Sequence, residues 1–149
     1  MKTLTPKQQA LFTLFNEIGI ISQLSSARLA RMLPHGLTVA QFSVLNHLVR
    51  LEGDWSPARL AAAFQVTKGT MTSTLQRLVA KGLISLEPDP SDGRAKHVKL
   101  TEAGGVAREA ALAAAGPSLG ELNAALSPAE IDTLIPALQK LRIWLDNHR

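Results

Sequence analysis

Six helix-start signals divide the 149-residue chain and constrain its fold more than any other feature of the sequence. Each is a Ser or Thr whose hydroxyl can accept a hydrogen bond from a backbone N–H in the first turn of the next helix. Pro at the first helical position, or Gln or Glu at the third, strengthens several of them. The six residues are Thr5, Thr38, Ser56, Thr67, Thr101 and Ser127. They predict a mainly helical fold, with helices over about 6–32, 38–51, 56–63, 67–80, 102–125 and 128–147.

Two short segments between these helices read as strands. Residues 83–87 and 96–100 flank the sequence PDPSDGRA, whose Pro, Gly and Asp residues are typical of a loop. The resulting hairpin follows two short helices that have the proportions of a helix-turn-helix. The predicted fold class is therefore a winged helix-turn-helix, mainly α with a small β-hairpin wing, flanked by long N- and C-terminal helices.

The Ala-rich helix over 102–125 contains one strong helix breaker. Gly116 and Pro117 fall in its middle, and proline removes a helical hydrogen bond and clashes with the preceding turn. We expect a kink or a break near residues 113–117.

Positive charge is concentrated in the central third of the chain. Residues 55–100 contain seven basic and three acidic side chains, an excess of four that equals the net charge of the whole chain. The basic residues are Arg59, Lys68, Arg77, Lys81, Arg94, Lys96 and Lys99. Such a region suits a polyanion, and a solvated face with no partner is the alternative.

The helix over 67–80 has an apolar face and a small polar one. At about 100° per residue, Met71, Leu75, Leu78 and Val79 share one sector, which we predict to be buried. The opposite face carries Gly69, Thr70, Ser73, Gln76, Arg77 and Ala80. Ser and Gln can read base edges in a major groove, while Lys68, Thr70, Thr72 and Arg77 can reach phosphates. The alternative is a polar face that only contacts solvent.

The hairpin loop carries a second candidate for DNA contact. Asp92 and Arg94 are two residues apart, so on one side of an extended hairpin the carboxylate can hold the guanidinium outward. Arginine suits the narrow minor groove. The alternative is that Ser91-Asp92-Gly93 is turn chemistry alone. Lys96 and Lys99 are expected on opposite faces of their strand.

Several classes of protein are excluded by what the sequence lacks. It has no cysteine, and therefore no disulfide framework, cysteine-ligated zinc or thiol switch. The four histidines, His35, His47, His97 and His148, show no metal-ligand spacing, and no catalytic fingerprint is present. We expect neither an enzyme nor a metal or other cofactor. With no signal peptide pattern and no apolar run of about 18 residues, we expect a cytoplasmic protein with no membrane partner.

Residues 37–101 resemble the core of MarR-type transcriptional regulators, through a set of motifs in the family's order and spacing. The motifs are Leu37-Thr38-x-x-Gln41-Phe42-x-Val44-Leu45, Leu60-Ala61, Val66-Thr67-Lys68-Gly69-Thr70-Met71-Thr72, Leu75-x-x-Leu78, Lys81-Gly82-Leu83-Ile84, Asp89-Pro90-x-Asp92-x-Arg94 and Val98-x-Leu100-Thr101-x-x-Gly104. The flanking helices fit the family's dimerisation elements by position and length.

The resemblance implies a homodimer that binds a pseudo-palindromic operator in double-stranded DNA, represses nearby genes and is released by a small molecule. It divides the chain into an N-terminal dimerisation helix (1–36), the DNA-binding core (37–101) and C-terminal dimerisation helices (102–149). Carried over by position or taken from the helical face, the DNA-contacting residues are Lys68, Thr70, Thr72, Ser73, Gln76, Arg77, Asp92 and Arg94.

Apolar stripes on the terminal helices suggest where two copies meet. The stripes exceed what a core of about 65 residues needs as cover, although they could also close the monomer's own core. The predicted dimerisation residues are Leu11, Phe15, Ile18, Leu134, Leu138, Leu141 and Leu145. A small aromatic or amphipathic effector is expected near the junction with the core, where Met32, His35, Phe42 and Trp55 are the candidate ligand contacts. Residues of these types are more often packing or surface residues than ligand contacts.

One rival function is a winged helix that binds protein and not DNA. It predicts an exposed apolar patch on the helix over 67–80. Ser73, Gln76 and Arg77 occupy that face, which favours DNA.

Overall fold

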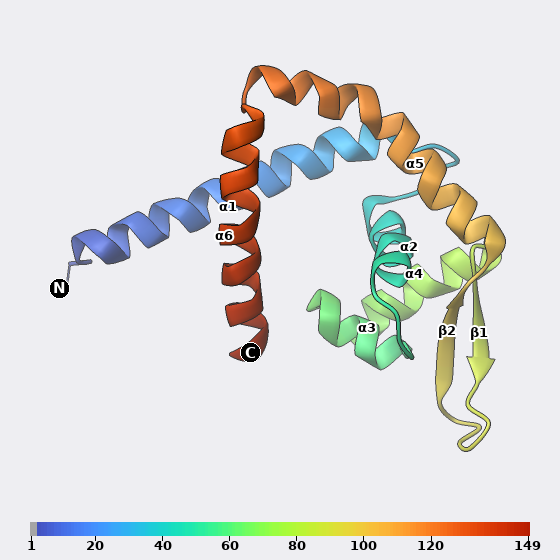
Figure 1. Ribbon diagram of the computed structural model, residues 1–149. Coiled ribbons are helices and arrows are strands. Elements are labelled where there is room, and N and C mark those ends of the chain that lie inside the picture. Colours follow the sequence, from blue (N-terminus) through green and yellow to red (C-terminus); the bar gives the residue numbers. More distant parts are fainter. Residues whose placement is uncertain (1–2) are drawn as a thin grey trace. The chain divides into compact units, whose positions relative to one another are not determined.

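The computed structural model describes residues 3–149 and contains six α-helices and one two-stranded antiparallel sheet in that range (Figure 1). The elements are α1 (Pro6–Met32), α2 (Val39–Arg50), α3 (Pro57–Phe64), α4 (Lys68–Ala80), β1 (Ile84–Pro88), β2 (Lys96–Leu100), α5 (Glu102–Glu121), a short 3₁₀ turn (Leu122–Ala124) and α6 (Pro128–Asn147). The chain divides into two compact units, and the boundary along the sequence lies between Ala114 and Ala115. The mainly helical fold with a hairpin wing is confirmed.

All six predicted caps form, because each needs only residues within one turn. Thr5, Thr38 and Ser127 make complete capping boxes with Gln8, Gln41 and Glu130. Ser56 and Thr67 cap α3 and α4, and the Thr101 hydroxyl accepts from the Gly104 N–H at 3.0 Å.

The core of the first unit lies among α2, α3, α4 and the hairpin. Leu45, Leu60, Leu75 and Leu78 are fully buried there. Met71, Leu75 and Leu78 confirm the predicted inner face of α4, but Val79 is wrong, since it is 40% exposed. Val79 lies one step, about 100°, beyond Leu78 around the helix, outside the stripe that packs on α2, α3 and β1.

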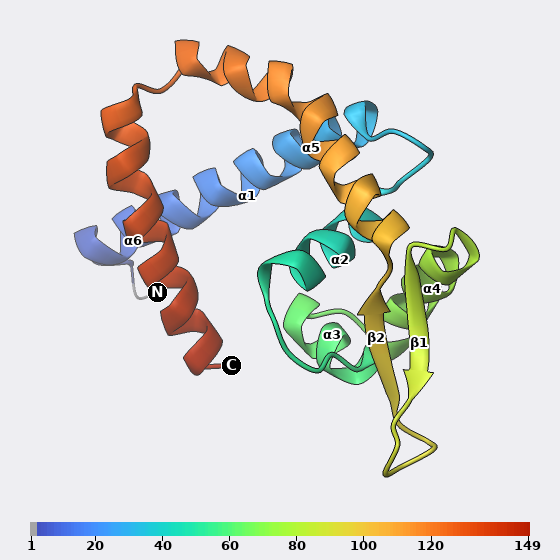
Figure 2. The same cartoon turned by 45° about the vertical axis from the view of Figure 1, so that its right-hand side comes forward.

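β1 and β2 form an antiparallel hairpin (Figure 2). Ile84 pairs with Leu100 at one end of it and Pro88 with Lys96 at the other. Its root is anchored by the Val98 N–H, which donates to the Trp55 carbonyl at 2.7 Å. The wing is thereby tied to the loop that precedes α3.

Of the predicted kink or break at 113–117, the break is wrong, because α5 continues through Pro117 to Glu121. One proline removes a single N–H from the ladder, and the preceding Ala run has the highest helix propensity of any residue type. The helix changes to a 3₁₀ turn only at Leu122, and α6 follows that turn.

Candidate nucleic-acid interface

A tight turn between α3 and α4 sets the two helices of the helix-turn-helix. Gln65 ends α3 in the left-handed conformation, with φ of 53°, and its side-chain Nε2 donates to the Ala62 carbonyl at 2.7 Å. The left-handed region is uncommon for a residue other than glycine. Residue 65 could not be predicted to adopt it, because glycine is the usual signal for such a position.

The outward face of α4 carries polar side chains that are available to a partner. Lys68, Thr70, Thr72, Ser73, Gln76 and Arg77 are all exposed. The Thr67 hydroxyl donates to the Thr70 hydroxyl at 2.9 Å, so Thr70 still has its own O–H to donate. Within residues 3–149, the side chains of Ser73, Gln76 and Arg77 have no hydrogen-bond partner.

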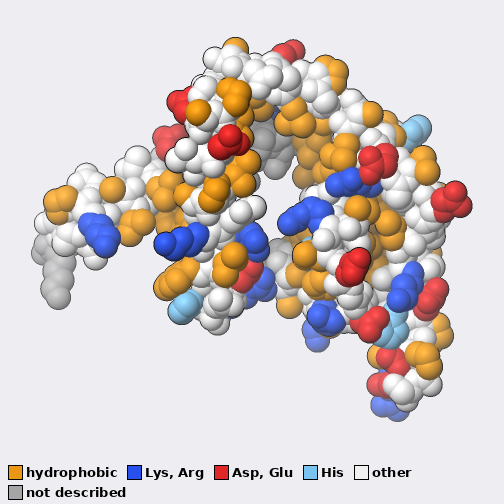
Figure 3. Space-filling view, in the orientation of Figure 1, with side chains coloured by type: hydrophobic (Ala, Val, Ile, Leu, Met, Phe, Trp, Pro, Cys, Tyr) orange, Lys and Arg blue, Asp and Glu red, His pale blue; other side chains and the backbone are white. Residues whose placement is uncertain are grey.

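A groove of about 360 Å³ lies between α4 and the wing, and three cationic side chains line it. Lys68 enters it from α4, and Arg94 and Lys96 enter it from the hairpin. Ser56, Pro57, Ala58, Thr72 and Ala95 complete its lining. Lys99 is on the opposite face of β2, as expected, with its Nζ 3.9 Å from Asp54 Oδ1. Lys and Arg side chains are also visible out to the tip of the hairpin (Figure 3).

Asp92 stabilises the backbone of the wing turn and does not pair with the Arg94 side chain. Its Oδ1 accepts from the backbone N–H of Arg94 at 3.0 Å, and no ion pair joins the two side chains in the described part of the chain. The anticipated pairing of carboxylate and guanidinium is therefore replaced by turn chemistry, and the Arg94 side chain lines the groove.

Asp89 organises the rest of the wing loop. One carboxylate oxygen accepts from the Ser91 N–H at 2.7 Å, the Ser91 hydroxyl at 2.6 Å and the Asp92 N–H at 3.3 Å. The other lies 2.7 Å from His97 Nε2. Hydrogen bonds from the Ser91 side chain and backbone, followed by the one with His97, hold the pKa of the Asp89 carboxyl well below its usual range. Sequence reasoning gave this residue no role of its own.

Lys81 does not belong to the basic face, although it lies in the positive third of the sequence. Its Nζ donates to the Gly36 carbonyl at 2.9 Å and to Gln41 Oε1 at 3.0 Å. Gln41 is buried. Lys81 directly follows α4, so these bonds fix the end of that helix to the start of α2.

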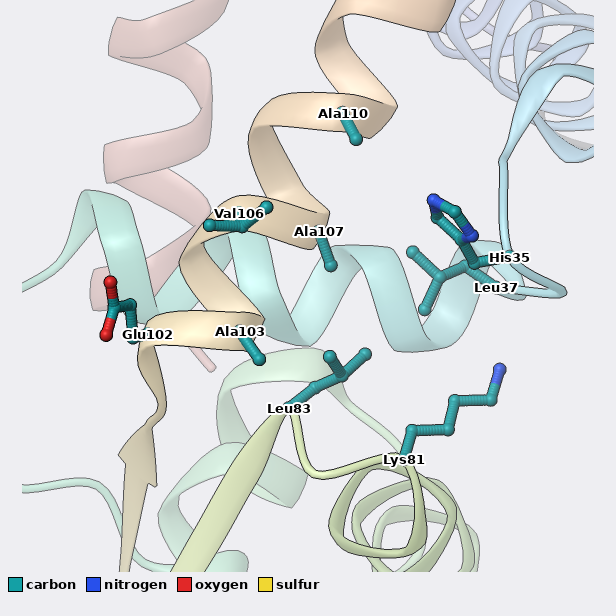
Figure 4. Close-up of a pocket in the computed structure, with 9 residues that line it drawn as sticks. All are labelled: His35, Leu37, Lys81, Leu83, Glu102, Ala103, Val106, Ala107 and Ala110. Carbon is teal, nitrogen blue, oxygen red and sulfur yellow. The ribbon is translucent and has the colours of Figure 1, made fainter.

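A second cavity, of about 660 Å³, lies beside Lys81 (Figure 4). His35 and Lys81 stand at one end and Glu102 at the other, with an apolar floor between them (Figure 4). The floor is formed by Leu37, Leu83, Ala103, Val106, Ala107 and Ala110. All of these residues belong to the first unit.

Only one of the four candidate ligand contacts lines this cavity, namely His35. Phe42 is buried in α2, and Met32 is half-buried at the end of α1. Trp55 packs edge-on against His47, with ring centroids 4.2 Å apart, beneath the Arg59 guanidinium. The sequence did not indicate Leu83 or the alanines of α5, because small apolar residues carry no signal of a cavity.

Residues 3–149 contain no group of three or more His, Cys, Asp or Glu side chains placed to hold a metal. In the same range, no helix is long and apolar enough to cross a membrane.

Comparisons with known proteins agree with the geometry of α4 and the wing. The model of the MarR family matches residues 35–95. Wild-type MarR from E. coli is 32% identical, with a TM-score of 0.74, over 94% of this chain and 98% of that one. A MarR mutant from E. coli complexed with operator DNA is 33% identical, with a TM-score of 0.72, over 89% and 95%.

A third structure concerns BpsR from Bordetella bronchiseptica, whose DNA binding is regulated by 6-hydroxynicotinic acid. It is 27% identical, with a TM-score of 0.72, over 87% of this chain and 98% of that one. Together with the outward face of α4 and the basic groove, these likenesses place the chain among regulators rather than enzymes. The chain belongs to the MarR family of transcriptional regulators.

Proposed function

We propose that this chain is a cytoplasmic repressor that binds a pseudo-palindromic operator as a homodimer, with α4 in the major groove and the wing in the adjacent minor groove. The observation that carries the proposal is the outward face of α4, whose free Ser73, Gln76 and Arg77 stand beside a groove lined by cations. Its domains would be residues 1–36 and 102–149 for dimerisation and 37–101 for DNA.

The two parts of the interface suit different parts of DNA. Ser73 and Gln76 can donate to and accept from base edges, and α4 is free of bulky groups there. Lys68, Thr70 and Thr72 lie in the first turns of α4 and Arg77 lies in its last turn, and all four can reach phosphates. Arg94 projects from a wing turn held by Asp92, and the most negative potential of DNA is found in a narrow minor groove.

Exposed apolar side chains support the homodimer. Leu11 and Phe15 on α1, and Leu134, Leu138 and Leu145 on α6, are each exposed in the single chain. Ile18 and Leu141 are half-buried. A second copy that covered them would remove a large apolar surface from water, and two-fold symmetry would then present two copies of α4 to successive half-sites.

The cavity beside Lys81 supports release by an effector. A small aromatic or amphipathic acid would place its ring on the apolar floor and its anionic group against His35 and Lys81. The acid would then compete with Gly36 and Gln41 for the Lys81 ammonium, and so loosen the end of α4. This route connects an occupied cavity to the position of the recognition helix.

The test of DNA binding is selection from a random duplex pool, followed by titration of the winner at two salt concentrations. We expect a two-fold symmetric site and a steep fall in affinity with salt, from several phosphate contacts. Gln76→Ala should cost about 1–3 kcal/mol of discrimination at its own base pair, whereas Arg94→Ala should weaken binding at the flanks. Arg142→Ala, on α6, is the matched control. No enrichment, with weak binding that is insensitive to salt, would contradict the proposal.

The effector is tested by blocking its cavity. Ala103 is exposed on the cavity wall, so Ala103→Trp should fill the space without strain in the core. With 6-hydroxynicotinic acid as the first probe among aromatic carboxylates, the parent should lose operator binding and the variant should keep it. Equal responses of the parent and the variant would place the effector elsewhere.

A further inference from the structure

One side-chain pair closes the wing loop where it leaves the two strands. Asp89 follows β1, His97 belongs to β2, and their Oδ2 and Nε2 atoms are 2.7 Å apart. The pair lies next to the last strand pairing, between Pro88 and Lys96, and beside the bond from the Asp89 N–H to the Ala95 carbonyl. It therefore controls the segment 89–95, which carries Arg94.

A continuous path of hydrogen bonds leads from this pair to Arg94. His97 fixes one oxygen of the Asp89 carboxylate, and the other oxygen accepts from Ser91 and from the Asp92 N–H. Asp92 in turn accepts from the Arg94 N–H. The loop has few apolar contacts to hold it, since Ser91, Asp92 and Arg94 are exposed. Its conformation consequently depends on these bonds.

The second nitrogen of His97 is unusual. Nδ1 is buried without a hydrogen-bond partner, and it lies 3.9 Å from Asp54 Oδ1 in the loop before α3. Because an ionised Asp89 only accepts, Nε2 must donate to it. Nε2 of the ring therefore holds the wing loop, while Nδ1 faces Asp54 of the neighbouring loop.

We propose that Asp89 and His97 are a positioning pair for Arg94: they hold the wing turn in the conformation from which the Arg94 side chain reaches DNA. The inference rests on the proposed DNA binding.

The first test needs no DNA, so its failure is distinct from failure of the proposed function. Hydrogen exchange of the free protein reports the amides of Ser91 and Asp92, which donate to Asp89. At one pH, His97→Ala should speed their exchange about fivefold or more. His97→Gln keeps an N–H donor near the Nε2 position, and it should exchange like the parent. Unchanged exchange in His97→Ala would overturn the proposal.

Coupling to Arg94 separates positioning from a general charge effect. If His97 acts through Arg94, the double variant with His97→Ala and Arg94→Ala should bind no more weakly than Arg94→Ala alone. Fully additive losses would contradict the inference.

Discussion

At the scale of single residues, the structure gives neighbouring and chemically similar side chains very different roles. Gly104 and Gly105 are adjacent in the first turns of α5, yet only the former is closely packed. A Cβ at Gly104 would lie 2.0 Å from the Leu83 carbonyl oxygen, whereas one at Gly105 would meet nothing nearer than Leu100 Cδ2 at 4.0 Å. The fold therefore requires glycine at one of these positions and not at the other.

This contrast predicts opposite changes in stability. Gly104→Ala should destabilise the protein by about 1–3 kcal/mol, because backbone atoms must move. Gly105→Ala should be neutral or stabilising by up to about 1 kcal/mol, from its higher helix propensity. Urea denaturation of the two variants measures both changes, and equal stability would show that the approach to Leu83 is not tight.

His47 is predicted to make stability depend on pH. Burial, assisted by the charge of Arg50, lowers the pKa of His47. The folded state then binds fewer protons than the unfolded state once the pH falls below about 6.5, and stability falls with it. His47→Phe, which retains an aromatic ring against Trp55, should lose less stability than the parent between pH 7.5 and 5.5 in urea titrations. His148→Gln should follow the parent, and an unchanged slope in His47→Phe would rule out this role.

At the scale of elements, α4 and the hairpin form one recognition unit because each is anchored at its end. Lys81 ties the end of α4 to Gly36 and Gln41, and the Trp55 carbonyl ties β2 to the loop before α3. Both anchors lie away from the outward face, which leaves Ser73, Gln76 and Arg77 free. Changes at either anchor can therefore move the interface without touching it.

Pro117 is predicted to lower the stability of the protein, because it lies inside the long helix α5. Pro128, by contrast, is at the first position of α6. Pro117→Ala should raise stability by about 1–3 kcal/mol, because it restores an interior hydrogen bond. Pro128→Ala should change it by less than about 0.5 kcal/mol, since the N–H at that position has no helical partner. Thermal unfolding followed by circular dichroism compares the two, and an equal response would show that Pro117 is accommodated without cost.

At the scale of the whole molecule, the apolar residues of α1 and α6 connect assembly to DNA binding. A single helix-turn-helix offers few contacts, and two half-sites bound together multiply modest affinities. The proposed dimer is thus a condition for tight operator binding. Any disruption of the dimer should lower affinity even when α4 is intact.

A charge placed on the apolar face tests this link. Leu138→Glu should shift the protein to monomer in analytical ultracentrifugation and weaken operator binding by an order of magnitude or more. Gln139→Glu, the neighbouring exposed position on α6, adds the same charge at a position that is already polar and should remain dimeric. A dimeric Leu138→Glu variant with full affinity would exclude this face from the interface.

Much of the fold was predictable because its signals are local. Caps at Thr5, Thr38 and Ser127 involve residues three positions apart, so the sequence contains both partners. The hairpin and the inner face of α4 follow likewise from turn residues and helical spacing. The family motifs also identified the wing turn, although not what Asp92 holds.

What the sequence by itself determined was where each element begins, which face of α4 points outward and to which family the chain belongs. Only the tertiary structure decided that Lys96, Lys68 and Arg94 line one groove. It also decided that Lys81 lies outside this groove and donates hydrogen bonds to Gly36 and Gln41. It further decided that Val79 is exposed, that α5 continues through Pro117 and that Asp89 lies beside His97. The physical reason is that a cap or turn is made by neighbours along the chain, whereas a side chain's distant partner depends on how whole elements pack.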